Sequence, residues 1–252
     1  MGPQPQARAV EDGGRGRSIV NALQSVDWTA VESALADRGF APLPRILTPD
    51  DCQSLSAMYG DDARFRSRID MARFRFGIGE YKYFGNPLPA LIRDLRQDLY
   101  RRLAPIANAW QSRLRSSRPR FPGTLDGFLK ICHAAGQRRP TPLLLSYTAG
   151  GHNCLHQDIY GDVAFPLQVV FGLNRPGDDY DGGELIFVEQ RPRAQSRGFA
   201  VRVAQGEGVV FTTRERPVAG TRGDYRVALR HGVSTITSGS RMTLGIIFHD
   251  AH

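Results

Sequence analysis

The sequence predicts a mainly β fold with flanking helices, in which the C-terminal half of the chain forms a double-stranded β-helix, or jelly roll. Short apolar or alternating segments separated by turn residues run from residue 143 to the C-terminus, whereas the helical patterns lie before residue 111. A chain of 252 residues with 41% apolar content can bury one sizeable core. We therefore expect one domain at residues 18–252, with a helical and hairpin extension at 18–124 and the jelly-roll core at 125–252.

The N-terminal segment lacks hydrophobic periodicity and is followed by helix boundaries. Residues 1–17 are rich in Gly, Pro, Arg and Gln, so we expect a disordered tail. Asp27 is placed to cap a helix that Gly39 ends. A strand follows at residues 40–43, and Thr48 with the following proline opens a second short helix.

Residues 64–84 interleave cationic and aromatic side chains. Residues 71–76 and 81–84 alternate with period two around a glycine-containing turn, which predicts a β-hairpin with one aromatic and one largely basic face. Such a flap can stack a nucleobase on its rings, at about 1–3 kcal/mol per base, while its cations hold the backbone. In the alternative interpretation, the rings fill the core and the arginines are solvated. The candidate substrate contacts are Phe76, Tyr81, Lys82 and Tyr83 here, with Tyr160 and Gln168 further along the chain.

The longest helix is predicted to begin after Asn86-Pro87, because apolar residues recur at three- and four-residue intervals as far as Trp110. Pro105 lies inside this pattern, and we expect it to kink the helix or end it early. A basic connector then leads into strands separated by turn residues. The predicted strands span residues 143–147, 155–160, 166–173, 184–188, 200–203, 208–212, 226–233 and 241–248.

His156-Gln157-Asp158, with His231 further along the chain, has the composition of a metal site. Residues two apart on a strand point to the same face, so the imidazole of His156 and the carboxylate of Asp158 can reach one ion. His231 supplies a second imidazole. Two histidines and one carboxylate on one side of an ion leave positions open for a co-substrate and O₂, as in non-haem Fe(II) oxygenases. In the alternative interpretation, both histidines are satisfied core residues.

An anion pocket is predicted beside the metal site. Strict alternation over residues 241–248 puts Arg241 and Thr243 on one face of a strand. A guanidinium binds a carboxylate with two parallel hydrogen bonds, and a hydroxyl on the same face adds a third. Tyr147 ends a buried strand, and its phenol can reach the same anion. We therefore expect these three side chains to hold the distal carboxylate of 2-oxoglutarate.

The triplet and the arginine belong to a longer series of motifs, namely Tyr147, Ala149-Gly150-Gly151, His156-Gln157-Asp158, Asp181-Gly182-Gly183-Glu184, His231-Gly232-Val233, Gly239 and Arg241. In this order they resemble the 2-oxoglutarate/Fe(II) dioxygenase superfamily over roughly the C-terminal half of the chain. Residues 160–168, 189–193 and 245–251 resemble a bacterial family thought to demethylate damaged nucleic acid oxidatively. The chain is also similar to AlkB-like and prolyl-hydroxylase-like enzymes, although prolyl hydroxylases usually carry Lys where this chain has Arg241.

The resemblance implies both a cofactor set and an activity. Fe(II) would be bound by His156, Asp158 and His231, with 2-oxoglutarate and O₂ as co-substrates and ascorbate as a candidate reductant. The implied activity is oxidative demethylation of alkylated nucleic-acid bases. The alternative is hydroxylation of a protein or peptide side chain such as proline, and a third hypothesis is a metal-binding barrel that binds nucleic acid without turnover.

Composition limits the partners and the compartment. The net charge of +8 and the pI near 9.9 come almost entirely from arginine, which favours single-stranded or damaged nucleic acid as a partner. In the alternative interpretation, the many arginines reflect only the composition of the genome and indicate no partner. No segment approaches the ~20 apolar residues of a membrane span, and the three cysteines lack metal-finger spacing. We expect a cytoplasmic protein with reduced thiols and no membrane partner, and the sequence leaves the oligomeric state open.

Overall fold

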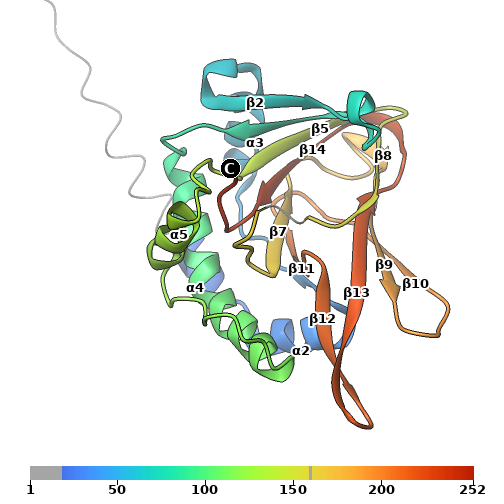
Figure 1. The fold of residues 1–252 in the computed structure, drawn as a ribbon. Coiled ribbons are helices and arrows are strands. Elements are labelled where there is room, and N and C mark those ends of the chain that lie inside the picture. Colours follow the sequence, from blue (N-terminus) through green and yellow to red (C-terminus); the bar gives the residue numbers. More distant parts are fainter. Residues whose placement is uncertain (1–18, 159–160) are drawn as a thin grey trace, which may run out of the picture.

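Two antiparallel sheets face each other in the computed structural model, which describes residues 19–158 and 161–252 (Figure 1). The predicted tail at residues 1–17 and Tyr160 lie outside the described residues. The larger sheet has the order β1 (Phe40–Leu43), β11 (Gly208–Thr212), β7 (Leu167–Gly172), β14 (Ile236–Ile246), β5 (Leu143–Thr148), β4 (Glu80–Phe84) and β2 (Phe65–Asp70), with β8 (Tyr180–Gly182) paired to β14. The smaller sheet has the order β10 (Arg197–Val201), β9 (Leu185–Gln190), β13 (Gly223–Val233), β6 (His152–His156) and β3 (Gly77–Ile78), with β12 (Glu215–Gly220) paired to β13. The predicted mainly β, jelly-roll class is confirmed.

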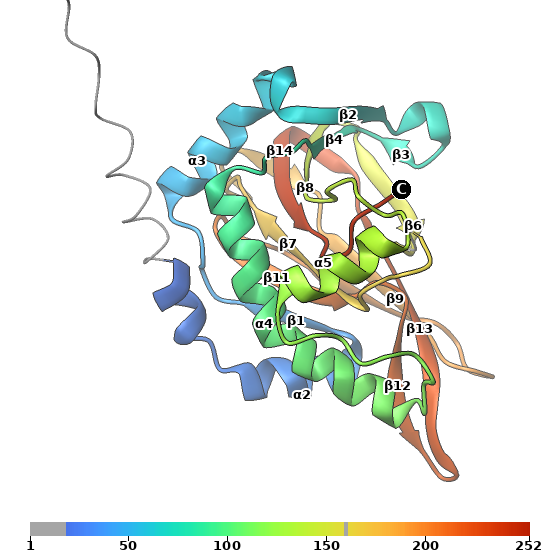
Figure 2. The same cartoon turned by 60° about the vertical axis from the view of Figure 1, so that its left-hand side comes forward.

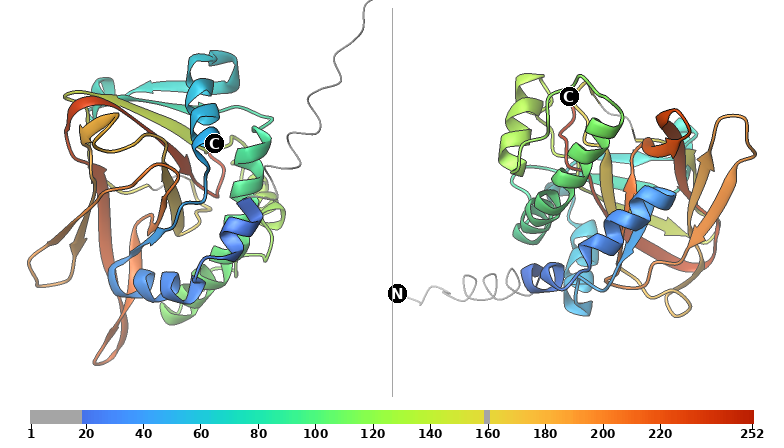
Figure 3. Two further views of the ribbon diagram at one scale, coloured as in Figure 1. Left: turned by 180° about the vertical axis from the view of Figure 1, so that it is seen from behind. Right: turned by 90° about the horizontal axis from the view of Figure 1, so that it is seen from below.

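The helices lie on one side of the two sheets and cover the larger one (Figure 2). They are α2 (Trp28–Arg38), α3 (Pro49–Ala57), α4 (Ala90–Arg113) and α5 (Leu125–Ala134). Their apolar faces form one core with the outward side chains of the larger sheet. A second core, which includes Val170, Phe187 and Phe211, fills part of the space between the sheets. The β9–β10 hairpin projects from the smaller sheet on the side away from the helices, whereas the β12–β13 hairpin extends beside α2 and the end of α4 (Figure 3).

The alternation of β14 decides which side chains reach the interior. Leu244 and Ile246 pack into the helix-covered core, as the sequence pattern predicts. Arg241 and Thr243 point the other way, into a cavity between the sheets. Because side chains alternate along a strand, β14 packs apolar side chains against the helices and presents polar side chains to the cavity between the sheets.

Several boundaries predicted from the sequence are confirmed. The side chain of Asp27 accepts hydrogen bonds from two backbone N–H groups in the first turn of α2, and Gly39 ends that helix in the left-handed region. The side chain of Thr48 accepts from the backbone N–H of Asp51 at the start of α3. β1 and β11 span the predicted residues, and most other predicted strands differ only at their ends. Strands β8 and β12 were not predicted.

The predicted hairpin is wrong in its first strand. β4 pairs with β2 at residues 65–70, and the segment beyond turns through a short 3₁₀ helix, η3 (Ala72–Phe74). The side chain of Asp70 accepts from the backbone N–H of Ala72 and so ends β2, and Arg75 turns the chain with a φ of 59°. Strand β3 then pairs with β6 of the smaller sheet. The segment therefore joins the two sheets at one end of the cavity.

The helical layer also differs from the prediction. Pro105 does not end α4, which continues to Arg113, because buried residues on both sides of the proline hold the helix against the sheet. Helix α5 was not predicted, and it occupies part of the segment assigned to the strands of the core. Its apolar side chains Leu125, Phe128 and Cys132 have helical spacing, and Thr124 caps it. Among the described residues, no helix combines the length and apolarity that a membrane span requires.

A buried ion pair fixes the end of the chain to α4. Arg96 is 2% exposed, donates hydrogen bonds to the carbonyls of Ile247 and Phe248, and pairs with Asp250 at 2.8 Å. The second carboxylate oxygen of Asp250 lies 3.0 Å from Nε2 of His133 on α5. Arg96 thus holds the segment that follows β14, the strand that carries Arg241.

Replacing Asp250 by alanine should lower the free energy of unfolding by about 3 kcal/mol, because it leaves a buried guanidinium without its counter-ion. The exposed pair of Arg101 and Asp98 on the same helix is the matched control, and Asp98→Ala should change stability by less than about 1 kcal/mol. Equilibrium unfolding in urea measures both variants. Equal losses in the two variants would contradict the role given to Asp250.

Candidate active site

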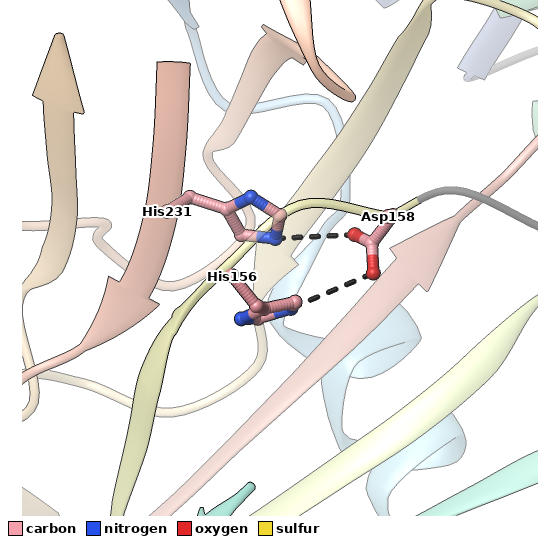
Figure 4. Close-up of side chains that lie close together, drawn as sticks. All are labelled: His156, Asp158 and His231. Carbon is pink, nitrogen blue, oxygen red and sulfur yellow. Dashed lines mark ion pairs between the residues drawn. The ribbon is translucent and has the colours of Figure 1, made fainter. Parts of the chain in front are cut away.

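Strand pairing brings the two predicted histidines together. His156 is the last residue of β6 and lies directly opposite His231 on β13. Their ring centroids are 4.2 Å apart. Asp158 does not share the strand face with His156, as the sequence analysis expected, because β6 ends at His156. Instead, the backbone N–H of Asp158 donates to the carbonyl of Thr213, and this contact fixes the segment that places its carboxylate over both imidazoles (Figure 4).

The three side chains converge on one point. Oδ1 of Asp158 lies 3.5 Å from Nε2 of His156, and Oδ2 lies 3.1 Å from Nε2 of His231. One ligand atom from each residue lies within 4.8 Å of the others, which is close enough for a single ion. Within the described ranges, this is the one group of histidine, cysteine and acidic side chains with such geometry.

Hydrogen bonding orients the His156 imidazole for a cation. Nδ1 of His156 lies 2.8 Å from the carbonyl oxygen of Cys154. A carbonyl can only accept, so Nδ1 carries a proton, and Nε2, which faces Asp158, is the nitrogen that remains for a metal. Nε2 of His231 faces the same carboxylate. The site therefore offers two imidazole nitrogens and one carboxylate, a ligand set for a divalent metal.

The charge states suit a cation as well. Burial opposes ionisation of Asp158, but the interactions with His231 and His156 outweigh it and hold the pKa of Asp158 well below its usual range. Burial lowers the pKa of His231. Burial also opposes protonation of His156, but the hydrogen bond and charge of Asp158 outweigh it and raise the pKa of His156. The carboxylate is therefore ionised, and a metal would take the place of a proton that Asp158 favours on His156.

Gln168 supports the carboxylate. Sequence analysis placed it in the lining of a substrate pocket, and it does line the cavity from β7. Its amide Nε2 also donates to Oδ2 of Asp158 at 2.7 Å, and the side chain is buried. Gln168 therefore helps to fix the orientation of the acidic ligand, a role that the sequence pattern did not reveal.

The cavity between the sheets has a volume of about 380 Å³ and joins the triad to the predicted anion pocket. Arg241, Thr243 and Tyr147 all line it, as predicted. Arg241 is 2% exposed, and its Nε atom has no hydrogen-bond partner in the described part of the chain. Among the described residues, no carboxylate forms an ion pair with this guanidinium, and burial of a charge without such a pair is costly, so the geometry fits an anionic ligand.

Tyr147 lies beside Arg241 as its cross-strand partner on β5. The guanidinium carbon of Arg241 is 5.7 Å from the centre of the Tyr147 ring. Burial raises the pKa of Tyr147 to about 12, so its phenol stays protonated and can donate to an anion. The side chain of Asn153, which was not predicted, donates to the phenol oxygen at 3.4 Å.

The predicted substrate residues divide between the two faces of β4. Tyr81 and Tyr83 line the cavity, and so does Phe76 near its mouth. Lys82 lies on the opposite face, where its ammonium group donates to the Tyr59 carbonyl and pairs with Asp62. Alternation along the strand accounts for this difference. Lys82 therefore forms an ion pair within the fold and does not make the predicted contact with a substrate.

Phe211 and Arg75 are among the cavity residues that the sequence analysis did not identify. The ring of Phe211 lies 4.7 Å from that of His231, and the alternation of the predicted strand at residues 208–212 could have indicated its inward direction. Arg75 also lines the cavity. Its position depends on a turn with positive φ, which periodicity does not reveal.

The fold and the geometry of the site together identify the class of protein. A jelly roll that places two histidines, a carboxylate and a buried arginine around one cavity is the arrangement of 2-oxoglutarate- and Fe(II)-dependent oxygenases. A solved oxidoreductase of the 2OG-Fe(II) oxygenase family from Burkholderia pseudomallei has this fold, with a TM-score of 0.51 and 15% identity over 89% of this chain and 92% of that chain. A Pseudomonas putida prolyl-4-hydroxylase also gives a TM-score of 0.51, with 18% identity over 89% of this chain and 99% of that chain.

The particular family follows from the sequence comparison. The family described as "Oxygenase, catalysing oxidative methylation of damaged DNA" matches residues 79–251, well over half of the chain. The chain belongs to this family and is an oxidoreductase of the 2-oxoglutarate/Fe(II) oxygenase class. "Uncharacterized protein Rv2227" of Mycobacterium tuberculosis is 45% identical over 228 residues, which cover 90% of this chain and 92% of the relative.

Replacing Gln168 by methionine should weaken binding of Mn(II), a redox-stable probe, by about 10–100-fold, because Asp158 loses the donor that orients it. The matched control is Gln190→Met, since the amide of Gln190 bonds to the Arg191 and Ala194 carbonyls in an exposed loop. Calorimetric titration of the apoprotein with Mn(II) measures each affinity. Wild-type affinity in Gln168→Met would remove this residue from the metal site.

Proposed function

We propose that the protein uses Fe(II) and 2-oxoglutarate to demethylate alkylated nucleic-acid bases oxidatively. His156, Asp158 and His231 would hold the metal. Arg241, with Thr243 and Tyr147, would hold the distal carboxylate of 2-oxoglutarate. The observation that carries the proposal is that the ion-sized triad and the buried guanidinium of Arg241 face the same cavity.

The residues present fit both groups. Two imidazoles and a carboxylate suit Fe(II) and leave part of its coordination sphere for other ligands. When bound, Fe(II) with 2-oxoglutarate and O₂ supplies the oxidising power to insert oxygen into a substrate C–H bond, with succinate and CO₂ as the other products. Oxidation of an N-methyl group gives a hydroxymethyl group that collapses to formaldehyde and the free base. On an alkylated base, such chemistry would remove the methyl group.

The protein's own side chains would bind and orient 2-oxoglutarate and exclude water from the cavity. The fork of Arg241 can take a carboxylate with two parallel hydrogen bonds, and the hydroxyl of Thr243 lies two residues along the same face. The protonated phenol of Tyr147 can add a further donor. Tyr81 and Tyr83 wall the cavity with aromatic surface, which keeps water away from the reacting groups.

An apolar and cationic rim at the mouth of the cavity supports a nucleic-acid substrate. Of the six exposed large hydrophobic side chains in the described residues, four lie on two segments that β3 and β6 bring together. These four are Phe74, Phe76, Ile78 and Leu155, and we call them, with Arg73 and Arg75, the aromatic rim. Concentrated apolar exposure marks an interaction surface.

The composition of the aromatic rim suits bases joined by phosphates. The rings of Phe74 and Phe76 are stacked with centroids 5.6 Å apart, and the guanidinium of Arg73 lies 6.0 Å from the Phe74 ring. Exposed rings can stack on bases while arginines contact the phosphates between them. The net charge of +8 favours the same partner. A peptide could also cover the apolar part of the rim, which keeps a protein hydroxylase as the alternative function.

Iron-loaded protein supplied with 2-oxoglutarate and N-methylated single-stranded DNA should release formaldehyde and succinate in equal amounts. The same base in a duplex should react more slowly, because it must first be flipped out of the stack. A pool of proline-containing peptides serves as the competing substrate and is examined by mass spectrometry for a gain of one oxygen. Succinate with an oxidised peptide and no formaldehyde would move the assignment to a protein hydroxylase. Absence of succinate with every substrate would leave a metal-binding barrel without turnover.

Replacing Arg241 by alanine should raise the KM for 2-oxoglutarate by about 100-fold, because two charge-assisted hydrogen bonds to a carboxylate are lost. Arg241→Lys keeps the charge but not the fork, so its KM should lie between those of the wild type and the alanine variant. Steady-state succinate production at varied 2-oxoglutarate gives both values, with the exposed Arg230→Ala as control. An unchanged KM in Arg241→Ala would place the distal carboxylate elsewhere.

A further inference from the structure

We propose that Gly183 fixes the position of the Arg241 guanidinium and thereby sets the length of the 2-oxo diacid that the cavity accepts. The inference rests on the proposed function of Arg241 as the residue that binds the distal carboxylate. Gly183 lies in the turn between β8 and β9, outside the metal site and outside the residues that line the cavity. It would act as a positioning residue through Arg241.

The backbone of Gly183 lies directly against the stem of the arginine. A Cβ atom at this position would stand 2.8 Å from Cδ and 3.4 Å from Nε of Arg241, and it would overlap Cδ1 of Ile236. Real Cβ atoms do not approach either side chain this closely, so a side chain at Gly183 requires Ile236 to move and, in addition, Arg241 or the turn. The φ of 67° at Gly183 also favours glycine.

The turn itself cannot easily move. The backbone N–H of Gly183 donates to the Thr235 carbonyl at 3.2 Å, and the Ser234 N–H donates to the Glu184 carbonyl at 3.0 Å. The Glu184 N–H donates to the hydroxyl of Ser234, which in turn donates to the Glu184 carboxylate. On the other side, Gly182 is held in register with Ile236 across β8 and β14. The turn is thus fastened to the segment that leads into β14.

Arg241 is therefore the part that yields. Its stem lies against the turn, and its guanidinium lies beside the ring of Tyr147, its neighbour on β5. Because Arg241 lines the cavity and Gly183 does not, displacement away from Gly183 carries the guanidinium toward the interior. The space between Arg241 and the triad would become shorter, and a shorter diacid would fit better than 2-oxoglutarate.

The test measures binding without turnover. Protein loaded with Mn(II) is titrated calorimetrically with 2-oxoglutarate, with oxaloacetate, which is one methylene shorter, and with 2-oxoadipate, which is one longer. Gly183→Ala should raise the Kd of 2-oxoglutarate by about 10–100-fold, since a misplacement near 1 Å has effects of that size. It should raise the Kd of oxaloacetate less and leave the Kd of Mn(II) unchanged.

Two further variants separate the contact with Arg241 from other effects. Gly150→Ala is the matched control, because Gly150 also has positive φ, at 85°, but a Cβ there meets no atom within 4 Å. It should bind all three diacids as the wild type does. The double variant Gly183→Ala/Ile236→Val removes Cδ1 of Ile236, the tightest overlap, and leaves the contact with Arg241. It should keep the altered preference, and it provides the test if Gly183→Ala alone does not fold.

Each outcome has a defined meaning. Wild-type affinity and selectivity in the Gly183 variants would overturn the inference, and so would full recovery in the double variant, which would trace the effect to Ile236. A wild-type protein that binds Mn(II) but no 2-oxoglutarate would instead refute the proposed function. The two failures are distinguishable because the wild-type titration is read before the variants.

Discussion

The site depends first on the pairing of β6 with β13. Opposite residues in an antiparallel pair bring their side chains close together, so this register places the imidazoles of His156 and His231 side by side. A slip of one residue would turn one of the histidines to the other face of the sheet. β13 is held on its other edge by β9, with Phe187 opposite His231, and this second pairing fixes the register of the strand. The position of Asp158 then needs only a short turn beyond β6.

Ion pairing distinguishes the buried arginines that stabilise the fold from the buried arginine of the candidate site. Three arginines are almost fully buried in the described part of the chain. Arg96 pairs with Asp250, and Arg216 pairs with Glu189, so both contribute to packing with their charge compensated. Among the residues that the structure describes, Arg241 forms no such ion pair, and it faces a cavity. Since burial of an uncompensated charge costs several kcal/mol, the fold retains Arg241 at the expense of stability, which is typical of a ligand site.

Local patterns predicted the features that depend on one strand or one helix end. The alternation of β14 gave the inward direction of Arg241 and Thr243, and residue types gave the members of the triad. The features that depend on contacts between distant segments were missed. The outward position of Lys82 could not be predicted without knowing which face of β4 lies against the cavity. The contact of Gln168 with Asp158 could not be predicted without knowing that β7 approaches the turn after β6. The sequence pattern indicated no role for Arg96, because its partner Asp250 lies more than 150 residues away.

The site and the aromatic rim are joined through backbone contacts, which bears on how a substrate is aligned. β3 pairs with β6, and the carbonyl of Phe76 accepts from the backbone N–H of Cys154, two residues before His156. Because backbone hydrogen bonds link the rim to the strand of His156, a base stacked on the rim would lie at a fixed distance from this metal ligand. His156 of the proposed metal site and the rings proposed for substrate recognition are thus positioned by the same backbone contacts, so a change in the rim would shift a bound base relative to the metal ligands.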